Sequence, residues 1–190
     1  LGDVYKRQVY MQAKANYARK FGLHDVGALL VYQRKEELLG NAGSVIKSLP
    51  KRNQGISGRM SYGYDSRYFA EFNFGYNGSE RFAAHERYGF FPSFGLGYII
   101  SNESFWEPLL NTMDKLKFKM TYGLVGNDAI GSSDDRFYYL SEVNPNDGGR
   151  GQYFGTNYGN QMNGVSISRY PNTNITWEKS KKGNFGIELG

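Results

Sequence analysis

The sequence predicts an all-β fold, an antiparallel segment of about seven strands from a large transmembrane β-barrel, with long extracellular loops and mostly short periplasmic turns. Three observations predict it. Stretches of about ten residues alternate between apolar and polar side chains, which is the two-residue period of a strand and the length that a tilted strand needs to cross a bilayer. The connections between these stretches alternate between short and long, and the polar positions carry Gly, Ser, Thr, Asn and Lys, as a water-filled lumen requires.

The composition favours strands and turns over helices. The 190 residues include 16 Tyr, 13 Phe and 25 Gly, and the mean hydropathy is −0.60. No run approaches eighteen apolar residues, which excludes a transmembrane helix, whereas barrel strands hide their apolar residues at every second position. The chain has no Cys, which excludes disulfides, Cys-based metal sites and Cys nucleophiles.

The net charge of +5 has one dense cluster, at Lys179, Lys181 and Lys182. No basic stripe accompanies it, so we interpret it as a solvated strand end and expect no nucleic-acid partner.

Residues 1–8, LGDVYKRQ, are set aside from the fold. The codons GAT GTG TAT AAG AGA CAG encode Asp-Val-Tyr-Lys-Arg-Gln, and this DNA looks like a transposon-end sequencing adapter read in frame. We therefore expect residues 1–8 not to be native. We expect residues 9–190 to be a partial barrel domain that is truncated at both sides, since the final FGIELG stops within a strand pattern.

The first elements are two strands and a charged connection. Residues 9–18 alternate, although a helix could use the same stretch. The short turn RKFG leads to a second strand over residues 24–33. Residues 34–54 are predicted to be a connection, in which Pro50 argues against a central strand.

A hairpin follows. Residues 55–64 form its first strand, and the tight turn DSR leads into YFAEFNFGY, the clearest alternation in the chain. One face there holds Tyr68, Ala70, Phe72, Phe74 and Tyr76, and the other holds Phe69, Glu71, Asn73, Gly75 and Asn77. The next signal, Asn77-Gly78, predicts a turn.

Three further strands complete the pattern. They cover residues 89–100, 115–125 and 175–189. Residues 126–172 show no sustained period, so we predict a long irregular connection that is too long to be passive.

Alternation alone leaves a second fold open, because a soluble β-sandwich strand also has one apolar and one polar face. Strand length, the alternating connections and the polar face favour the barrel. In hydrocarbon every backbone donor and acceptor must pair, which only a closed sheet achieves without edges.

Catalysis finds little support. His24 and His85 are the only histidines and form no metal-ligand motif, so we expect no enzyme, no cofactor and no metal. Asp134 and Asp135 could contact a cation or a sugar, although solvated loop carboxylates are commoner. Residues 144–151, NPNDGGRG, lack the spacing of a calcium loop, and we interpret them as a plain turn.

Four stretches carry a resemblance to a known family. They are LPKRNQGISGRMSYGYDSRYFAEFNFGYNGSERFA, YGFFPSFGLGYIISNESFW, LKFKMTYGLVGND and NTNITWEKSKKGNFGIELG. In order and spacing the sequence resembles the barrel of the SusC/RagA family, the TonB-dependent outer-membrane transporters of Bacteroidetes, over nearly all of residues 9–190.

The resemblance implies a 22-stranded barrel with an N-terminal plug in the Gram-negative outer membrane. It implies uptake of oligomeric nutrients, glycans or peptides, with a SusD-like lipoprotein as a cap and with TonB acting through an N-terminal segment that this sequence does not contain. The alternative from another class is a soluble, secreted carbohydrate-binding β-sandwich.

The candidate site residues fall into two groups. The face pattern points five residues inward, where they would line the plug interface or the substrate path: Arg59, Glu71, Asn73, Lys117 and Lys119. Five loop aromatics could stack on a sugar ring or contact the lipoprotein, with loop self-packing as the alternative: Tyr138, Tyr139, Tyr153, Phe154 and Tyr158.

Three more aromatic residues are assigned to the membrane boundary. Trp177 is interpreted as an interfacial anchor beside a lumen-side Glu178. Phe105 and Trp106 are interpreted as part of a packed turn.

Overall fold

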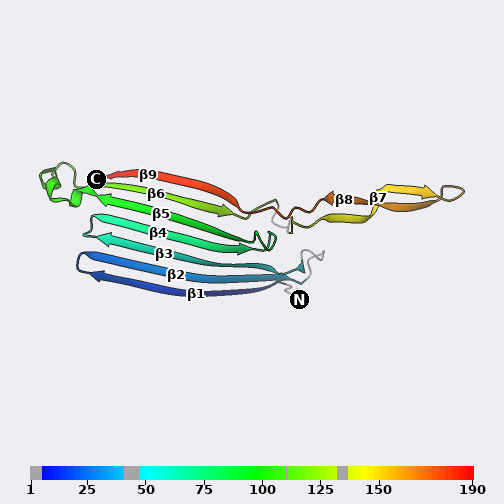
Figure 1. Ribbon diagram of the computed structural model, residues 1–190, viewed down its shortest axis with the longest axis horizontal. Coiled ribbons are helices and arrows are strands. Elements are labelled where there is room, and N and C mark those ends of the chain that lie inside the picture. The colour runs from blue at the N-terminus through cyan, green and yellow to red at the C-terminus, as the bar shows by residue number, and fades with distance from the viewer. Residues whose placement is uncertain (1–5, 41–47, 110, 132–136) are drawn as a thin grey trace, which may run out of the picture. The chain divides into compact units, whose positions relative to one another are not determined.

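The computed structural model describes residues 6–40, 48–109, 111–131 and 137–190 (Figure 1). These residues form two compact units. Residues up to Ser79 together with 88–128 and 177–190 make up the first, and residues 80–87 and 129–176 make up the second. No helix in the described ranges is long and apolar enough to span a membrane.

The first unit is one seven-stranded antiparallel sheet in which the first six strands follow the order of the chain and the last strand of the chain pairs with the sixth (Figure 1). Its order is β1-β2-β3-β4-β5-β6-β9. The strands are β1 (Lys6–Phe21), β2 (His24–Leu39), β3 (Lys51–Tyr64), β4 (Tyr68–Ser79), β5 (Tyr88–Ile99), β6 (Leu116–Asn127) and β9 (Glu178–Leu189). All seven predicted strands are therefore confirmed.

The prediction for residues 34–54 is wrong at both ends. Strand β2 continues to Leu39, and β3 begins at Lys51, directly after Pro50. Charged side chains pair across the extended strands, with Arg52 Nε of β3 3.4 Å from Glu36 Oε2 of β2. The charges that suggested a loop therefore satisfy one another between strands.

In the middle of the sheet the register places apolar residues opposite apolar residues. One continuous row across six strands consists of Tyr17, Ala28, Met60, Phe72, Phe94 and Tyr122. The adjacent row on the other face consists of Gly27, Ser61, Glu71, Gly95, Thr121 and Asn184. A slip of one residue in any pair would bring charged side chains onto the apolar face, so the pattern fixes the register.

Aromatic rows border the apolar face at both ends. The row beside the short turns holds Phe21, His24, Tyr64, Tyr68, Tyr98, Phe118 and Ile187. Eight residues further along β4, the row at the other end holds Tyr32, Ile56, Tyr76 and Phe90. Eight residues span about 27 Å of strand, or roughly 20 Å along the normal of a membrane at a 40° tilt. This height matches the apolar band of an outer-membrane barrel, which is about 25 Å tall between its aromatic girdles.

The apolar face is exposed. Met60 is 59% exposed and Tyr122 is 56% exposed, and in the described residues only three hydrophobic side chains are buried, those of Phe82, Ala83 and Trp177. A sandwich would bury this face against a second sheet. The β-sandwich alternative therefore does not fit the structure.

Short connections join the strands at one end of the sheet (Figure 1). Gly22 and Leu23 link β1 to β2, and Asp65, Ser66 and Arg67 link β3 to β4. The third connection contains two 3-10 helices, η1 (Ile100–Asn102) and η2 (Ser104–Leu109), which explains why it is longer than the other two.

The second unit contains a hairpin, so the prediction that residues 126–172 are irregular is wrong. Strands β7 (Glu142–Phe154) and β8 (Asn160–Arg169) pair antiparallel, with register shifts at three places along β7. Each shift interrupts the alternation of side chains. The two-residue period that revealed the other strands is therefore lost here.

Candidate functional site

Three of the five residues predicted to face inward lie together on the polar face. The guanidinium of Arg59 on β3 donates to the carboxylate of Glu71 on β4, and Asn73 Nδ2 donates to Glu71 Oε1 at 2.8 Å. The register explains the contact. Arg59 lies directly opposite Asn73, and Glu71 is the next residue on the same face of β4. The three side chains thus form one charge-neutral cluster.

The other two, Lys117 and Lys119, converge on a residue that the sequence analysis did not select. Glu188 on β9 lies 2.6 Å from the Lys119 ammonium, 3.7 Å from that of Lys117 and 3.3 Å from that of Lys115. Glu188 is the cross-strand partner of Lys117. Its place on the polar side of the alternating 175–189 stretch was visible, but its pairing with β6 was not.

A hollow of about 460 Å³ lies on the polar face between these clusters. Its charged lining comes from Asp25, Arg59, Glu71, Lys117 and Lys119. Phe69 contributes an aromatic surface, and its register neighbours are Gly63 on β3 and Gly97 on β5. A Cβ at Gly63 would lie 3.4 Å from the Phe69 ring. Because the glycines on both sides of Phe69 have no side chains, its ring stays accessible beside the charged groups of the hollow.

Trp177 lies elsewhere than predicted. It is 8% exposed, and its ring centroid lies 5.1 Å from that of Phe91, a residue of the polar face. It is therefore an internal packing residue and not an interfacial anchor. The neighbouring Glu178 accepts a hydrogen bond from Asn127 Nδ2 at 3.0 Å across the β6–β9 pair.

The structure separates the five predicted loop aromatics into two groups. The guanidinium of Arg169 lies over the ring of Tyr138, with Arg169 Cζ 4.9 Å from the centroid of that ring. Tyr139 packs edge-on against Phe137. Both tyrosines lie near the end of the hairpin where Glu142 pairs with Arg169.

The other three mark the opposite end of the β7–β8 hairpin. Tyr153 and Phe154 close the strand pairing, opposite Gln161 and Asn160. Tyr158, in the connecting turn, is 74% exposed. Packing within the second unit thus accounts for Tyr138 and Tyr139, whereas Tyr153, Phe154 and Tyr158 remain open to a ligand. Asp134 and Asp135 lie outside the described residues.

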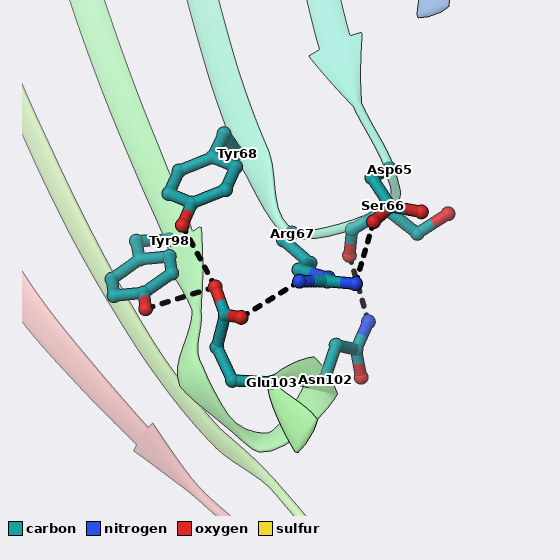
Figure 2. Close-up of polar contacts among 7 residues, drawn as sticks. All are labelled: Asp65, Ser66, Arg67, Tyr68, Tyr98, Asn102 and Glu103. Carbon is teal, nitrogen blue, oxygen red and sulfur yellow. Dashed lines mark hydrogen bonds and ion pairs between the residues drawn. The ribbon is translucent and has the colours of Figure 1, made fainter. Parts of the chain in front are cut away.

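A polar network that the sequence did not reveal connects the β3–β4 turn with the β5–β6 connection (Figure 2). The Glu103 carboxylate accepts hydrogen bonds from Tyr68 Oη at 2.7 Å, Tyr98 Oη at 3.1 Å and Arg67 Nη1 at 2.7 Å. Arg67 Nη2 also lies 2.6 Å from Asp65 Oδ2. The hydrogen bond from Tyr68, supported by Tyr98 and the charge of Arg67, holds the pKa of Glu103 below its ordinary value, although partial burial opposes this.

The comparisons with known proteins agree with this geometry. The chain is 32% identical to the TonB-dependent receptor SusC of Bacteroides thetaiotaomicron over 133 residues, which are 70% of this chain and 12% of the receptor. It is 30% identical to the TonB-dependent receptor P3 of Formosa agariphila over 134 residues, again 70% of this chain and 12% of the relative. No protein-family model matches.

Solved structures match the fold over almost the whole chain. The RagAB peptide importer in its closed-closed state superposes with a TM-score of 0.70 at 23% identity, covering 97% of this chain and 22% of that one. Its open-open state gives a TM-score of 0.65 at 25% identity, with 97% and 21% covered.

The sheet and the similar proteins together define the class of protein to which this chain belongs. It is a segment of a transmembrane β-barrel in the outer membrane of a Gram-negative bacterium. In sequence the chain is similar to the TonB-dependent receptors of the SusC/RagA family, and its sheet has the fold of a part of the RagAB importer. It spans about 12% of the length of the curated relatives it matches.

Proposed function

We propose that this chain is part of a barrel that imports oligomeric nutrients, glycans or peptides, across the outer membrane. TonB supplies the energy through a segment of the complete protein outside this chain, and a SusD-like lipoprotein caps the extracellular side. Support comes from the relatives named as TonB-dependent receptors and from the likeness to a structure described as a peptide importer. These relatives are described as receptors and importers, and none as an enzyme.

The observation that carries the proposal is the contrast between the two faces of the sheet. In a transmembrane barrel the apolar face meets lipid and the polar face lines the interior. Here the polar face carries the Arg59–Glu71 pair, the Lys119–Glu188 pair and the hollow beside Phe69. We assign these residues to the barrel interior, where they line the plug interface or the substrate path.

The chemistry of the hollow suits a polar oligomer. Paired charges present both donors and acceptors, while the Phe69 ring offers an apolar surface on which a sugar ring or a peptide side chain can pack. In the β7–β8 hairpin, Tyr153, Phe154 and Tyr158 are exposed aromatic groups of the same kind, and we assign them to the extracellular side and to contacts with the substrate or the lipoprotein.

We also propose that residues 1–8 are not native and that residues 9–190 are part of a larger barrel domain. Sequencing the genomic locus tests this directly: the native gene should lack the codons for LGDVYKRQ, and their presence in an uninterrupted reading frame would refute the adapter origin.

The functional test is uptake by cells that carry the complete transporter. Fluorescent oligosaccharides and peptides are offered with TonB present or deleted, and we expect uptake of one class only when TonB is present. Lys119→Gln should reduce that uptake, whereas Phe118→Leu, the adjacent residue on the other face, should not. Uptake that persists without TonB, or that responds equally to both variants, would contradict the proposal.

A further inference from the structure

The apolar face has a groove close to the short turns. Its row runs from Tyr62 through Ala70 and Leu96 to Met120, and Ala70 is the smallest side chain in it. Because its neighbours project further from the sheet, a groove of about 480 Å³ opens above Ala70. Tyr68, Tyr98 and Phe185 contribute to its walls.

One wall of the groove is held in place by the turn network. The rings of Tyr68 and Tyr98 stack with centroids 4.9 Å apart and planes 7° from parallel. Both hydroxyls donate to the carboxylate of Glu103 (Figure 2). Ring stacking and shared hydrogen bonds order the wall before a ligand arrives, which lowers the entropy cost of binding.

The network that holds this wall carries an excess of negative charge. Asp65 and Glu103 supply two carboxylates, and Arg67, which pairs with both, supplies one guanidinium (Figure 2). These groups lie just beyond the first aromatic row, at the depth of the lipid headgroups. A headgroup that carries a cation beside an anion complements this arrangement of charges.

We propose that this groove binds one ethanolamine phospholipid from the leaflet at the short-turn end of the barrel. One acyl chain lies over Ala70 between the aromatic walls. The ammonium lies at Asp65 and Glu103, where it can donate hydrogen bonds, and the phosphate faces Arg67. A choline headgroup has the same charge but no N–H donor, so the site distinguishes the two.

The experiment is native mass spectrometry of the complete transporter after equilibration with an equal mixture of ethanolamine and choline phospholipids of identical chains. The wild type should retain the ethanolamine lipid preferentially. Ala70→Phe fills the groove and should lower retention about tenfold, the effect of excluding about two methylene groups from an apolar site. Ala28→Phe, the same substitution on the same face but outside the groove, should retain lipid as the wild type does.

Headgroup selectivity is tested separately with Asp65→Asn and Glu103→Gln. Both keep polar side chains of nearly the same shape, so we expect lipid retention to persist while the preference for ethanolamine disappears. Wild-type protein that shows no preference, or Ala70→Phe protein that retains as much lipid as Ala28→Phe, would overturn the proposal. If Ala70→Phe does not fold, the headgroup preference of the wild type and its loss in the two polar variants decide the question.

Discussion

Lys119 Nζ lies 2.6 Å from Glu188 Oε1, although the two residues are 69 positions apart in the chain. The pair joins β6 to β9, the two strands between which the chain forms the β7–β8 hairpin. The sheet therefore continues across this long insertion with its register intact, and a charge pair on the polar face marks the junction.

Reversing the charges should show how much this junction contributes. Glu188→Lys places a fourth cation beside Lys115, Lys117 and Lys119 and should lower the free energy of unfolding by about 1 kcal/mol, a modest figure because the pair is partly exposed. The double variant Lys119→Glu/Glu188→Lys should recover part of the loss in urea titrations of the barrel in vesicles. Equal stability of both variants would show that the ion pair contributes nothing.

The turn between β3 and β4 should accept glycine. Asp65 and Ser66 have φ values of 51° and 53°, a left-handed conformation that costs non-glycine residues about 1 kcal/mol or more. Ser66→Gly should therefore stabilise the barrel by up to about 1 kcal/mol, since the Asn102 bond to the Ser66 backbone oxygen remains. Ser66→Val should destabilise it in the same urea titration, and the opposite order would contradict the turn geometry.

Glu103 should make stability depend on pH in the acid range. Its pKa is lower in the folded than in the unfolded state, so the stability that it contributes is present above the unfolded pKa of about 4.3 and is lost as the pH falls through the lowered folded value. Glu103→Gln should flatten this part of the pH profile of unfolding. Glu107→Gln, in the same connection, serves as the control, and identical profiles for both variants would argue against the network.

The fold could be predicted where side chains alternate without interruption. Residues 68–77 define β4 and its two faces by their period alone, and the same pattern gave the other six strands of the sheet. The β7–β8 hairpin escaped because bulges near Asn144 and Asp147 break that period. Local sequence thus reveals a regular strand and hides a bulged one.

The candidate site was predictable only in part, for a related reason. Alternation placed Arg59, Glu71 and Lys119 on the polar face, but a partner on a distant strand, such as Glu188, depends on register. The Glu103 network joins residues 35 and 36 positions apart, and the packing of Trp177 on Phe91 crosses from one strand to the start of another. No local pattern encodes such contacts.

Two adjacent residues of β4 can show whether one face of this sheet meets lipid and the other meets the barrel interior. Phe72 lies midway between the aromatic rows on the apolar face, and Asn73 lies next to it on the polar face. We measure the folding free energy of the complete barrel into phospholipid vesicles for Phe72→Arg and Asn73→Arg. We expect a loss of about 2–4 kcal/mol for Phe72→Arg, the cost of arginine at the bilayer midplane, and a much smaller change for Asn73→Arg. Equal costs, or a larger cost for Asn73→Arg, would contradict this assignment of the two faces.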